Sequence, residues 1–316
     1  MASNKITIIG AGSVGATVAY TLTLRGLAAE IVLIDVNENK ALGEAMDIRQ
    51  GTPLCAPISI YAGDYQAAAG SDIVVITSGI ARKPGQTRLE LCQTNVNIIK
   101  QIAPEITKYA PDAIYVLVSN PVDILTYVFS KISGVPESHV LGTGTLLDTA
   151  RLRSRISEYM CVNQRNVHAY VLGEHGDSSF IPWSIAQISQ INISDYRKHL
   201  NFQDAAMPEL DYQEIENYIR TSGGKIIQRK GATFYAIAIS VAYVCEAILD
   251  TSNTVLALST VMHGEYGIDD VALSVPCIIG PTGVRGKVLP PMTEEEVGKL
   301  QHSAKVLKDV IRQIEI

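Results

Sequence analysis

The sequence predicts an α/β protein: a doubly wound parallel six-stranded sheet, followed by an α+β part with antiparallel strands. Three observations support this. The first 35 residues read as strand, glycine turn, helix and strand; apolar and helical segments then alternate to about residue 143; and beyond residue 250 strands are separated by Gly and Pro turns. We therefore expect two domains, residues 1–143 and 144–316.

The first unit lies within Lys5–Asp35. A β-branched run precedes a G-x-G-x-x-G motif at Gly10, Gly12 and Gly15, and the next apolar residues fall at helical spacing. Gly10 lets the chain turn, Gly12 lets backbone N–H groups approach a pyrophosphate, and Gly15 lets the helix lie close to the strand. The phosphate charge would meet the positive end of the helix dipole. This unit predicts a Rossmann dinucleotide-binding domain over residues 1–143.

The helix is expected to stop at Arg25-Gly26, a cation in the last turn followed by a glycine suited to the left-handed position. A second strand, Ile31–Ile34, runs into Asp35, which lies 20 residues beyond Gly15. An acid at this distance accepts hydrogen bonds from the adenosine ribose hydroxyls, and its charge would repel a 2′-phosphate. We therefore predict NAD rather than NADP as the cofactor.

The rest of the first domain continues in the same alternation, with one long polar loop. Residues 72–77 (DIVVIT) are apolar on both faces, as in a buried parallel strand. The loop 78–88 carries three cations, with Gly and Pro to bend it. Helices are expected at 40–48, at 89–109 and up to about 133, and strands at 58–61, 72–77, 113–118 and 139–142.

The second half has a different pattern. A capping box at Thr293 and Glu296 opens a final helix with one apolar stripe. A tight polar turn, residues 173–177, follows a short apolar strand. Helices are expected at 147–160, 211–229 and 232–249, and strands at 167–172, 254–262, 272–279 and 285–289.

Composition narrows the class of protein. The chain has 316 residues, 47% of them hydrophobic and 18% charged, with a net charge of −6. The absence of a basic tract argues against nucleic acid as a partner. No apolar run approaches the ~20 residues of a bilayer span, and no signal-peptide pattern precedes the first strand, so we expect a cytoplasmic protein without a membrane partner. The five cysteines are scattered, which indicates reduced thiols, and nothing suggests a metal site.

Four residues could support reduction of a keto acid. His175 lies between glycines in the polar turn and suits proton exchange near neutral pH. Asp148 and Arg151 share one helix face among apolar neighbours, and buried charges require partners. Arg88 ends the cationic loop. Taken singly, these residues could equally be a turn histidine, a solvated ion pair and a surface cation.

Six segments together make the pattern more specific. They resemble the L-lactate and L-malate dehydrogenase family, and they cover nearly the whole chain in the family's order. The segments are GAGSVGATVAY, IDV, KPGQTRLEL, VSNPVDILTY, GTGTLLDTARLR and GEHGDSSFIPWS.

The resemblance implies a role for each candidate residue in an NAD-dependent oxidoreductase of glycolysis or fermentation. It implies that His175 is the acid/base that protonates the carbonyl oxygen and that Asp148 orients and stabilises its protonated form. Arg151 would grip the substrate carboxylate as a two-pronged fork, and Arg88 would polarise the carbonyl as the loop closes. Asn120 and Thr233 would line the site near the nicotinamide.

One position departs from the lactate pattern. Six residues before Arg88, where lactate enzymes usually carry Gln, this chain has Arg82, as malate enzymes do; Gln86 stands where many lactate enzymes have Glu. Closing an unpaired guanidinium over the methyl group of pyruvate would cost several kcal/mol, whereas the second carboxylate of oxaloacetate would satisfy it. Against this, Thr233, Ile237 and the last two segments are lactate-like. We expect pyruvate–L-lactate interconversion, with oxaloacetate–L-malate interconversion as the alternative.

The resemblance also implies partners. Arg153 and His168 match positions that bind an activating sugar bisphosphate, fructose 1,6-bisphosphate, in many bacterial lactate enzymes, although they could equally be a surface cation and a strand histidine. Family members are usually dimers or tetramers, so a homo-oligomer, tetramer or dimer, is expected. The small-molecule partner is a 2-keto or 2-hydroxy acid.

Two rival functions come from other classes. Tyr127 and Lys131 fit the Y-x-x-x-K pair of short-chain dehydrogenases, but that family has a differently spaced glycine turn, and a Tyr one helical turn from a Lys is common by chance. An NAD-binding sensor or scaffold would tolerate the loss of His175 or Arg151, yet both are present.

Overall fold

The structure is a computed structural model that describes residues 4–80, 87–201 and 208–316. Strands and helices alternate through the first half, as the sequence predicts. The elements are β1 (Lys5–Ile9), α1 (Ser13–Arg25), β2 (Glu30–Ile34), α2 (Glu38–Gly51), β3 (Ser59–Ala62), β4 (Ile73–Ile76), α3 (Arg88–Tyr109), β5 (Ile114–Leu117), α4 (Val122–Ile132) and β6 (Val140–Gly142).

The second half begins with a helix and ends with one. Its elements are α5 (Leu146–Met160), β7 (Val167–His168), β8 (Gln187–Ile188), β9 (Ile191–Asn192), α6 (Ile193–Tyr196), α7 (Tyr212–Lys230), α8 (Tyr235–Leu249), β10 (Thr254–His263), β11 (Asp269–Gly280), β12 (Gly283–Lys287) and α9 (Glu294–Ile311). The capping box at Thr293 and Glu296 opens α9, as predicted.

The six strands of the first half form a parallel sheet in the order β3-β2-β1-β4-β5-β6. The chain runs outward from β1 to β3 and then returns to β4 on the other side of β1. This reversal makes the doubly wound arrangement that the sequence predicts, and it opens a crevice at the carboxyl ends of β1 and β4.

The sheet does not end at β6. Ser259 of β10 pairs antiparallel with Gly142 of β6, and β11 and β12 extend the same sheet to nine strands. A Cβ at Gly142 would lie 2.2 Å from Thr126 Oγ1 and 3.1 Å from the Ser259 side chain, so only glycine allows this close approach. The predicted antiparallel strands are present, but they continue the first sheet.

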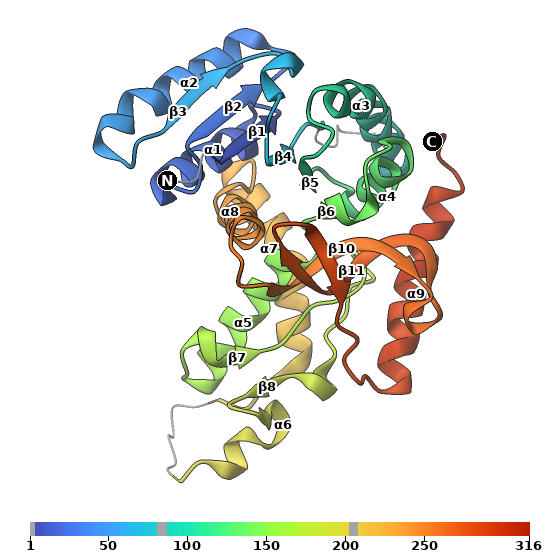
Figure 1. Cartoon of the computed structure of the whole chain (residues 1–316). Coiled ribbons are helices and arrows are strands. Elements are labelled where there is room, and N and C mark those ends of the chain that lie inside the picture. Colours follow the sequence, from blue (N-terminus) through green and yellow to red (C-terminus); the bar gives the residue numbers. More distant parts are fainter. Residues whose placement is uncertain (1–3, 81–86, 202–207) are drawn as a thin grey trace.

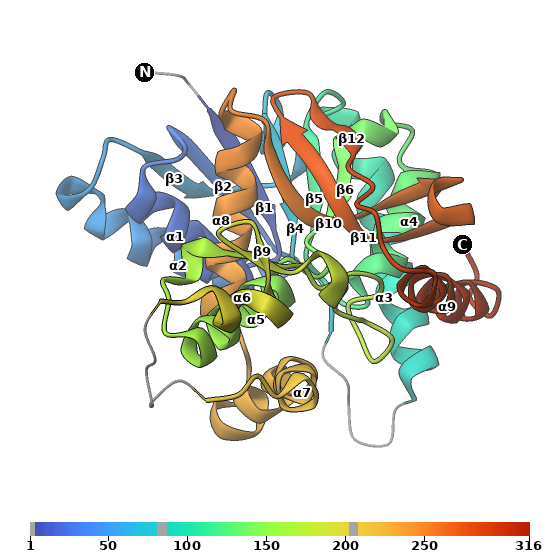
Figure 2. The same ribbon diagram turned by 90° about the horizontal axis from the view of Figure 1, so that it is seen from below.

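Helices cover the sheet in two groups (Figures 1 and 2). One group contains α1, α2 and α8, with α1 packed on both of the others, and the second contains α3, α4 and α9. One apolar core runs through both halves of the chain, and a smaller one lies among α5, α7 and the short sheet β7-β8-β9.

The predicted strand 167–172 is wrong beyond His168. At Val171 side chains of helix α5 take the place of a neighbouring strand: the Thr149 hydroxyl accepts a hydrogen bond from Val171 N–H at 3.0 Å, and the Thr145 hydroxyl donates one to the Val171 carbonyl at 2.5 Å. Sequence periodicity does not reveal such side-chain partners. Leu172 forms an isolated antiparallel bridge with Phe180.

Several boundaries also move. The strands expected at 272–279 and 285–289 are Asp269–Gly280 and Gly283–Lys287, the helix expected at 40–48 is Glu38–Gly51, and the helix expected from 232 begins at Tyr235.

A Thr149→Val substitution should therefore destabilise the fold with little change in shape. It leaves the buried Val171 N–H without an acceptor, which costs about 1–3 kcal/mol of unfolding free energy. Chemical denaturation measures this loss. The control is Thr107→Val, because the Thr107 hydroxyl binds only its own helix; equal midpoints for the two variants would refute the assignment.

Candidate active site

The glycine turn fits a dinucleotide pyrophosphate. Gly10 has φ +104°, in the region that favours glycine. A Cβ on Gly15 would lie 1.8 Å from the Gly10 carbonyl oxygen, so Gly15 is required by the protein itself. A Cβ on Gly12 would meet no described protein atom within 4 Å. The space beside Gly12 is thus left for something other than the protein.

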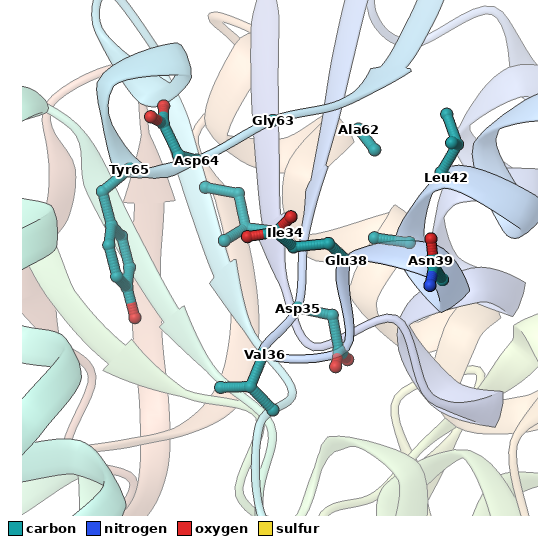
Figure 3. Close-up of a pocket in the computed structure, with 11 residues that line it drawn as sticks. Ile34, Asp35, Val36, Glu38, Asn39, Leu42, Ala62, Gly63, Asp64 and Tyr65 are labelled. Carbon is teal, nitrogen blue, oxygen red and sulfur yellow. The ribbon is translucent and has the colours of Figure 1, made fainter.

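Asp35 follows β2 and ties the turn to the next helix. Its Oδ2 accepts a hydrogen bond from Ala11 N–H at 2.6 Å, and its Oδ1 accepts one from Asn37 N–H at 2.8 Å. Each carboxylate oxygen keeps a lone pair for a ribose hydroxyl. Asp35 and Val36 line a cavity of about 620 Å³ together with Ala62 and Tyr65, and Figure 3 shows these lining residues. The residues present therefore fit the adenosine end of NAD.

A second cavity, of about 300 Å³, brings together residues that are far apart in the sequence. Val14, from the start of α1, is on its wall, which places the cavity next to the glycine turn. Five of the predicted site residues also line it. They are Asn120, Asp148, Arg151, His175 and Thr233.

Asp148 is the centre of the charged group in this cavity. Its Oδ2 lies 2.6 Å from His175 Nδ1, and its Oδ1 accepts a hydrogen bond from Arg151 Nη1 at 2.9 Å. The Asp148 side chain is 9% exposed, Arg151 13% and His175 28%. Because Asp148 binds Nδ1, the Nε2 edge of the imidazole is left for a substrate. The predicted i,i+3 pair is therefore buried and shared with the histidine.

The pKa values of the pair favour an imidazolium beside a carboxylate. Burial lowers the pKa of His175, but the charge of Asp148, the hydrogen bond to it and the charge of Asp123 outweigh burial and repulsion by Arg151, so the pKa is raised. Burial raises the pKa of Asp148, yet His175 and then Arg151 bring it below its ordinary value. The histidine therefore holds a proton above the pH at which a free imidazole loses it.

Arg88 is placed outside the cavity wall. Its Nη1 lies 2.6 Å from Asp177 Oδ2, and both side chains are 77% exposed. Asp177 itself lines the cavity, so the guanidinium stands at the rim. The sequence analysis did not foresee this pair, which is too exposed to contribute much stability. Arg82 and Gln86, on which the choice between pyruvate and oxaloacetate depends, lie outside the described residues.

Asn95 and Arg220 were also missed. Asn95 Nδ2 donates to the Asn120 carbonyl at 2.7 Å, and its Oδ1 accepts from Ile80 N–H at 2.9 Å, so Asn95 joins two segments beside the crevice. The available signal was its position on the buried stripe of α3. Arg220 of α7 lines the cavity and donates to the Ser179 carbonyl at 3.3 Å.

The remaining candidates lie elsewhere. Arg153 donates to the Ala169 carbonyl at 3.1 Å and lines a separate cavity of about 300 Å³ with Arg165, whereas His168 is exposed on β7 and is not part of that wall. Their joint role stays a prediction. Tyr127 and Lys131 both bind Asp270 of β11, at 2.9 and 2.7 Å, and neither lines the cavity of His175.

A dinucleotide cradle beside a cavity with a histidine–aspartate pair and a buried arginine defines an NAD-dependent dehydrogenase of 2-hydroxy acids. Comparison with protein-family models gives the same class. Residues 4–142 match the NAD binding domain of lactate/malate dehydrogenase, and residues 145–315 match its alpha/beta C-terminal domain. The chain belongs to the lactate/malate dehydrogenase family.

Relatives within the family are similar over their full length. An L-lactate dehydrogenase of Thermoanaerobacterium saccharolyticum is 46% identical, with 99% of this chain and 100% of the relative covered. One of Clostridium botulinum is 47% identical, with 98% and 96% covered. The solved structure of a minor L-lactate dehydrogenase from Enterococcus mundtii, 39% identical, superposes with a TM-score of 0.94 and covers 99% of both chains.

Two alanine substitutions should distinguish a glycine that is needed for folding from a glycine that is needed for NADH binding. Gly15→Ala should lower the unfolding free energy by about 1–3 kcal/mol, because its Cβ overlaps the Gly10 carbonyl. Gly12→Ala should change stability by less than about 1 kcal/mol but weaken NADH binding at least about tenfold. Thermal unfolding and NADH fluorescence titration measure the two effects; unchanged NADH affinity in Gly12→Ala would contradict the placement of the pyrophosphate.

Proposed function

We propose that this chain is an L-lactate dehydrogenase, which interconverts pyruvate and L-lactate with NAD. The observation that carries the proposal is the arrangement of His175, Asp148 and Arg151 in one cavity beside the glycine turn. The names of the relatives support the choice of substrate.

Geometry and charge support the proposed roles of His175, Asp148 and Arg151, and the resemblance to the family supplies those of Arg88, Asn120 and Thr233. Bound NADH supplies the hydride. Arg151, held by Asp148 on one side, binds the substrate carboxylate through its remaining N–H groups. His175 gives its Nε2 proton to the carbonyl oxygen and takes it back in the oxidation of lactate. Asp148 fixes the imidazole by its Nδ1 contact and stabilises the imidazolium. Arg88 leaves Asp177 to polarise the carbonyl, while Asn120 and Thr233 line the nicotinamide side.

The organisation of the chain is also proposed. In this proposal, residues 1–143 form the NAD-binding domain and residues 144–316 form the substrate domain of a cytoplasmic protein. In the part of the chain that the structure describes, no helix has the length and apolar character of a membrane span. Exposed apolar side chains on α1 and α8 support a homo-oligomer, a dimer or tetramer. They are Tyr20, Leu24, Tyr235, Ile239 and Tyr243. Arg153 and His168 are proposed to bind fructose 1,6-bisphosphate.

Oxaloacetate is the second candidate substrate, and Arg82 is the observation that favours it. A guanidinium in this loop suits the second carboxylate of oxaloacetate better than the methyl group of pyruvate. We expect measurable oxaloacetate reduction beside pyruvate reduction.

Steady-state assays on both keto acids test these substrate proposals. Arg82→Gln should lower the oxaloacetate-to-pyruvate ratio of kcat/KM by at least about tenfold, because it removes a partner of the second carboxylate. Lys83→Gln, which removes a charge from the same loop, serves as the control. An unchanged ratio in Arg82→Gln would refute the role of Arg82. If the wild-type protein oxidises NADH with no small 2-keto acid, the rival function of an NAD-binding sensor or scaffold is favoured.

The pH dependence of pyruvate reduction should report His175. Only the protonated imidazole donates a proton, and the pKa of His175 is raised above its ordinary value. Activity should thus persist above about pH 6.5 and fall as the pH rises through the shifted pKa. Asp148→Asn should move this fall to lower pH, because the neutral amide no longer stabilises the imidazolium. The measurement is kcat/KM between pH 5 and 10, buffered at constant ionic strength; a wild-type midpoint below 6.5 would contradict the assignment.

A further inference from the structure

Asp123 is a second carboxylate in contact with His175. It lies in the first turn of α4, it is 2% exposed, and its Oδ2 accepts a hydrogen bond from the His175 backbone N–H at 2.7 Å. Asp148 holds the imidazole ring from α5, whereas Asp123 holds the main chain of the same residue from α4. Two carboxylates on separate helices therefore fix one histidine.

Burial of this carboxylate is costly. Oδ1 of Asp123 has no hydrogen-bond partner among the described residues. The Ser259 hydroxyl is close enough to lower the pKa of Asp123, but the two groups do not meet hydrogen-bond geometry. Burial dominates and raises the pKa of Asp123 to about 6. The positive end of α4 offsets part of the cost. An asparagine would accept the same N–H bond without burying a charge, so the hydrogen bond alone does not explain an aspartate.

The charge has an effect at the imidazole. The charged groups with the largest effects on the pKa of His175 are Asp148 and Arg151 from α5 and Asp123 from α4, while Asp177 and Arg220 line the same cavity. The Asp148 carboxylate is shared with the Arg151 guanidinium, whose charge opposes protonation of the histidine. No cationic side chain pairs with Asp123 among the described ion pairs, and its neighbour Glu174 adds a further negative charge. Asp123 thus supplies negative charge that Arg151 does not neutralise.

We propose that Asp123 is a positioning residue for the reaction: it fixes the main chain at His175 and, together with Asp148, holds negative charge beside the imidazole. The proposal rests on the proposed dehydrogenase function. Without the negative charge of Asp123, the imidazole of His175 would lose its proton at a lower pH. This loss disfavours pyruvate reduction and favours lactate oxidation.

Asp123→Asn tests the charge while keeping the acceptor for the His175 N–H. The pH midpoint of kcat/KM for pyruvate reduction should fall by roughly one pH unit, and the midpoint for lactate oxidation should fall in parallel. Just above the wild-type midpoint, reduction should then be slower at a given pH, while oxidation below that midpoint becomes faster. A purely structural defect would lower both rates at every pH without moving either midpoint.

Controls separate the outcomes. Asp270→Asn removes an aspartate that also contacts α4, through Tyr127, and it should leave both profiles unchanged. Ser259→Ala keeps the Asp123 carboxyl group but removes the hydroxyl that lowers its pKa. Asp123 then loses its negative charge at a higher pH, so the midpoints should shift in the same direction by less. Thermal unfolding and NADH fluorescence verify that each variant is folded. If Asp123→Asn does not fold, the Ser259→Ala variant tests the proposal, and unchanged pH midpoints in that variant would overturn it.

Superimposed profiles of wild type and Asp123→Asn, or uniform losses without a shift, overturn the proposal. Wild-type protein without pyruvate or oxaloacetate reduction would instead overturn the proposed function, and the two failures are therefore distinct.

Discussion

The double contact of Asp148 is the interaction on which the site depends. One carboxylate holds the Nδ1 edge of His175 and one nitrogen of Arg151, so a single helix, α5, sets the position of the imidazole relative to the guanidinium. Burial strengthens both contacts and makes each partner costly to remove. The negative charge of Asp148 is therefore needed to hold His175 and Arg151 in place.

The sheet brings this pair to the cofactor. Parallel strands place their carboxyl ends at one edge, where the glycine turn after β1 and Asn120 after β5 lie. The second half is held against the first because β10 pairs with β6 and β11 pairs with β10. The turn that carries His175 is also held by the final helix, because Glu174 N–H donates to the Ser303 hydroxyl of α9 at 2.7 Å.

Sequence reasoning was successful where the signal is local. The glycine spacing, the acid after β2 and the capped helices depend on residues within a few turns of each other, so the pattern correctly predicts the elements. The cofactor contacts of the glycines and Asp35 stay predictions. The Asp148–Arg151 pair follows from helical spacing, and His175 from its place in a short turn.

Sequence reasoning failed where a partner comes from a distant element. Asp123 was read only as part of a motif, because no spacing links it to His175, 52 residues away. Asn95, Arg220 and the contact of Arg88 with Asp177 depend in the same way on packing between helices and loops. The strand expected at 167–172 is interrupted because the backbone groups of Val171 bind threonines of α5, which no alternation of apolar residues could indicate.

The pairing of β6 with β10 has a consequence for dissection of the molecule. A fragment that ended at residue 143 would present β6 as a bare edge, with unpaired backbone groups and an apolar face stripped of its cover. A fragment with such an unpaired edge strand is expected to aggregate. A chimaera that contains only the first half of the chain must therefore supply a replacement for β10, because the boundary between the two halves lies within one hydrogen-bonded sheet.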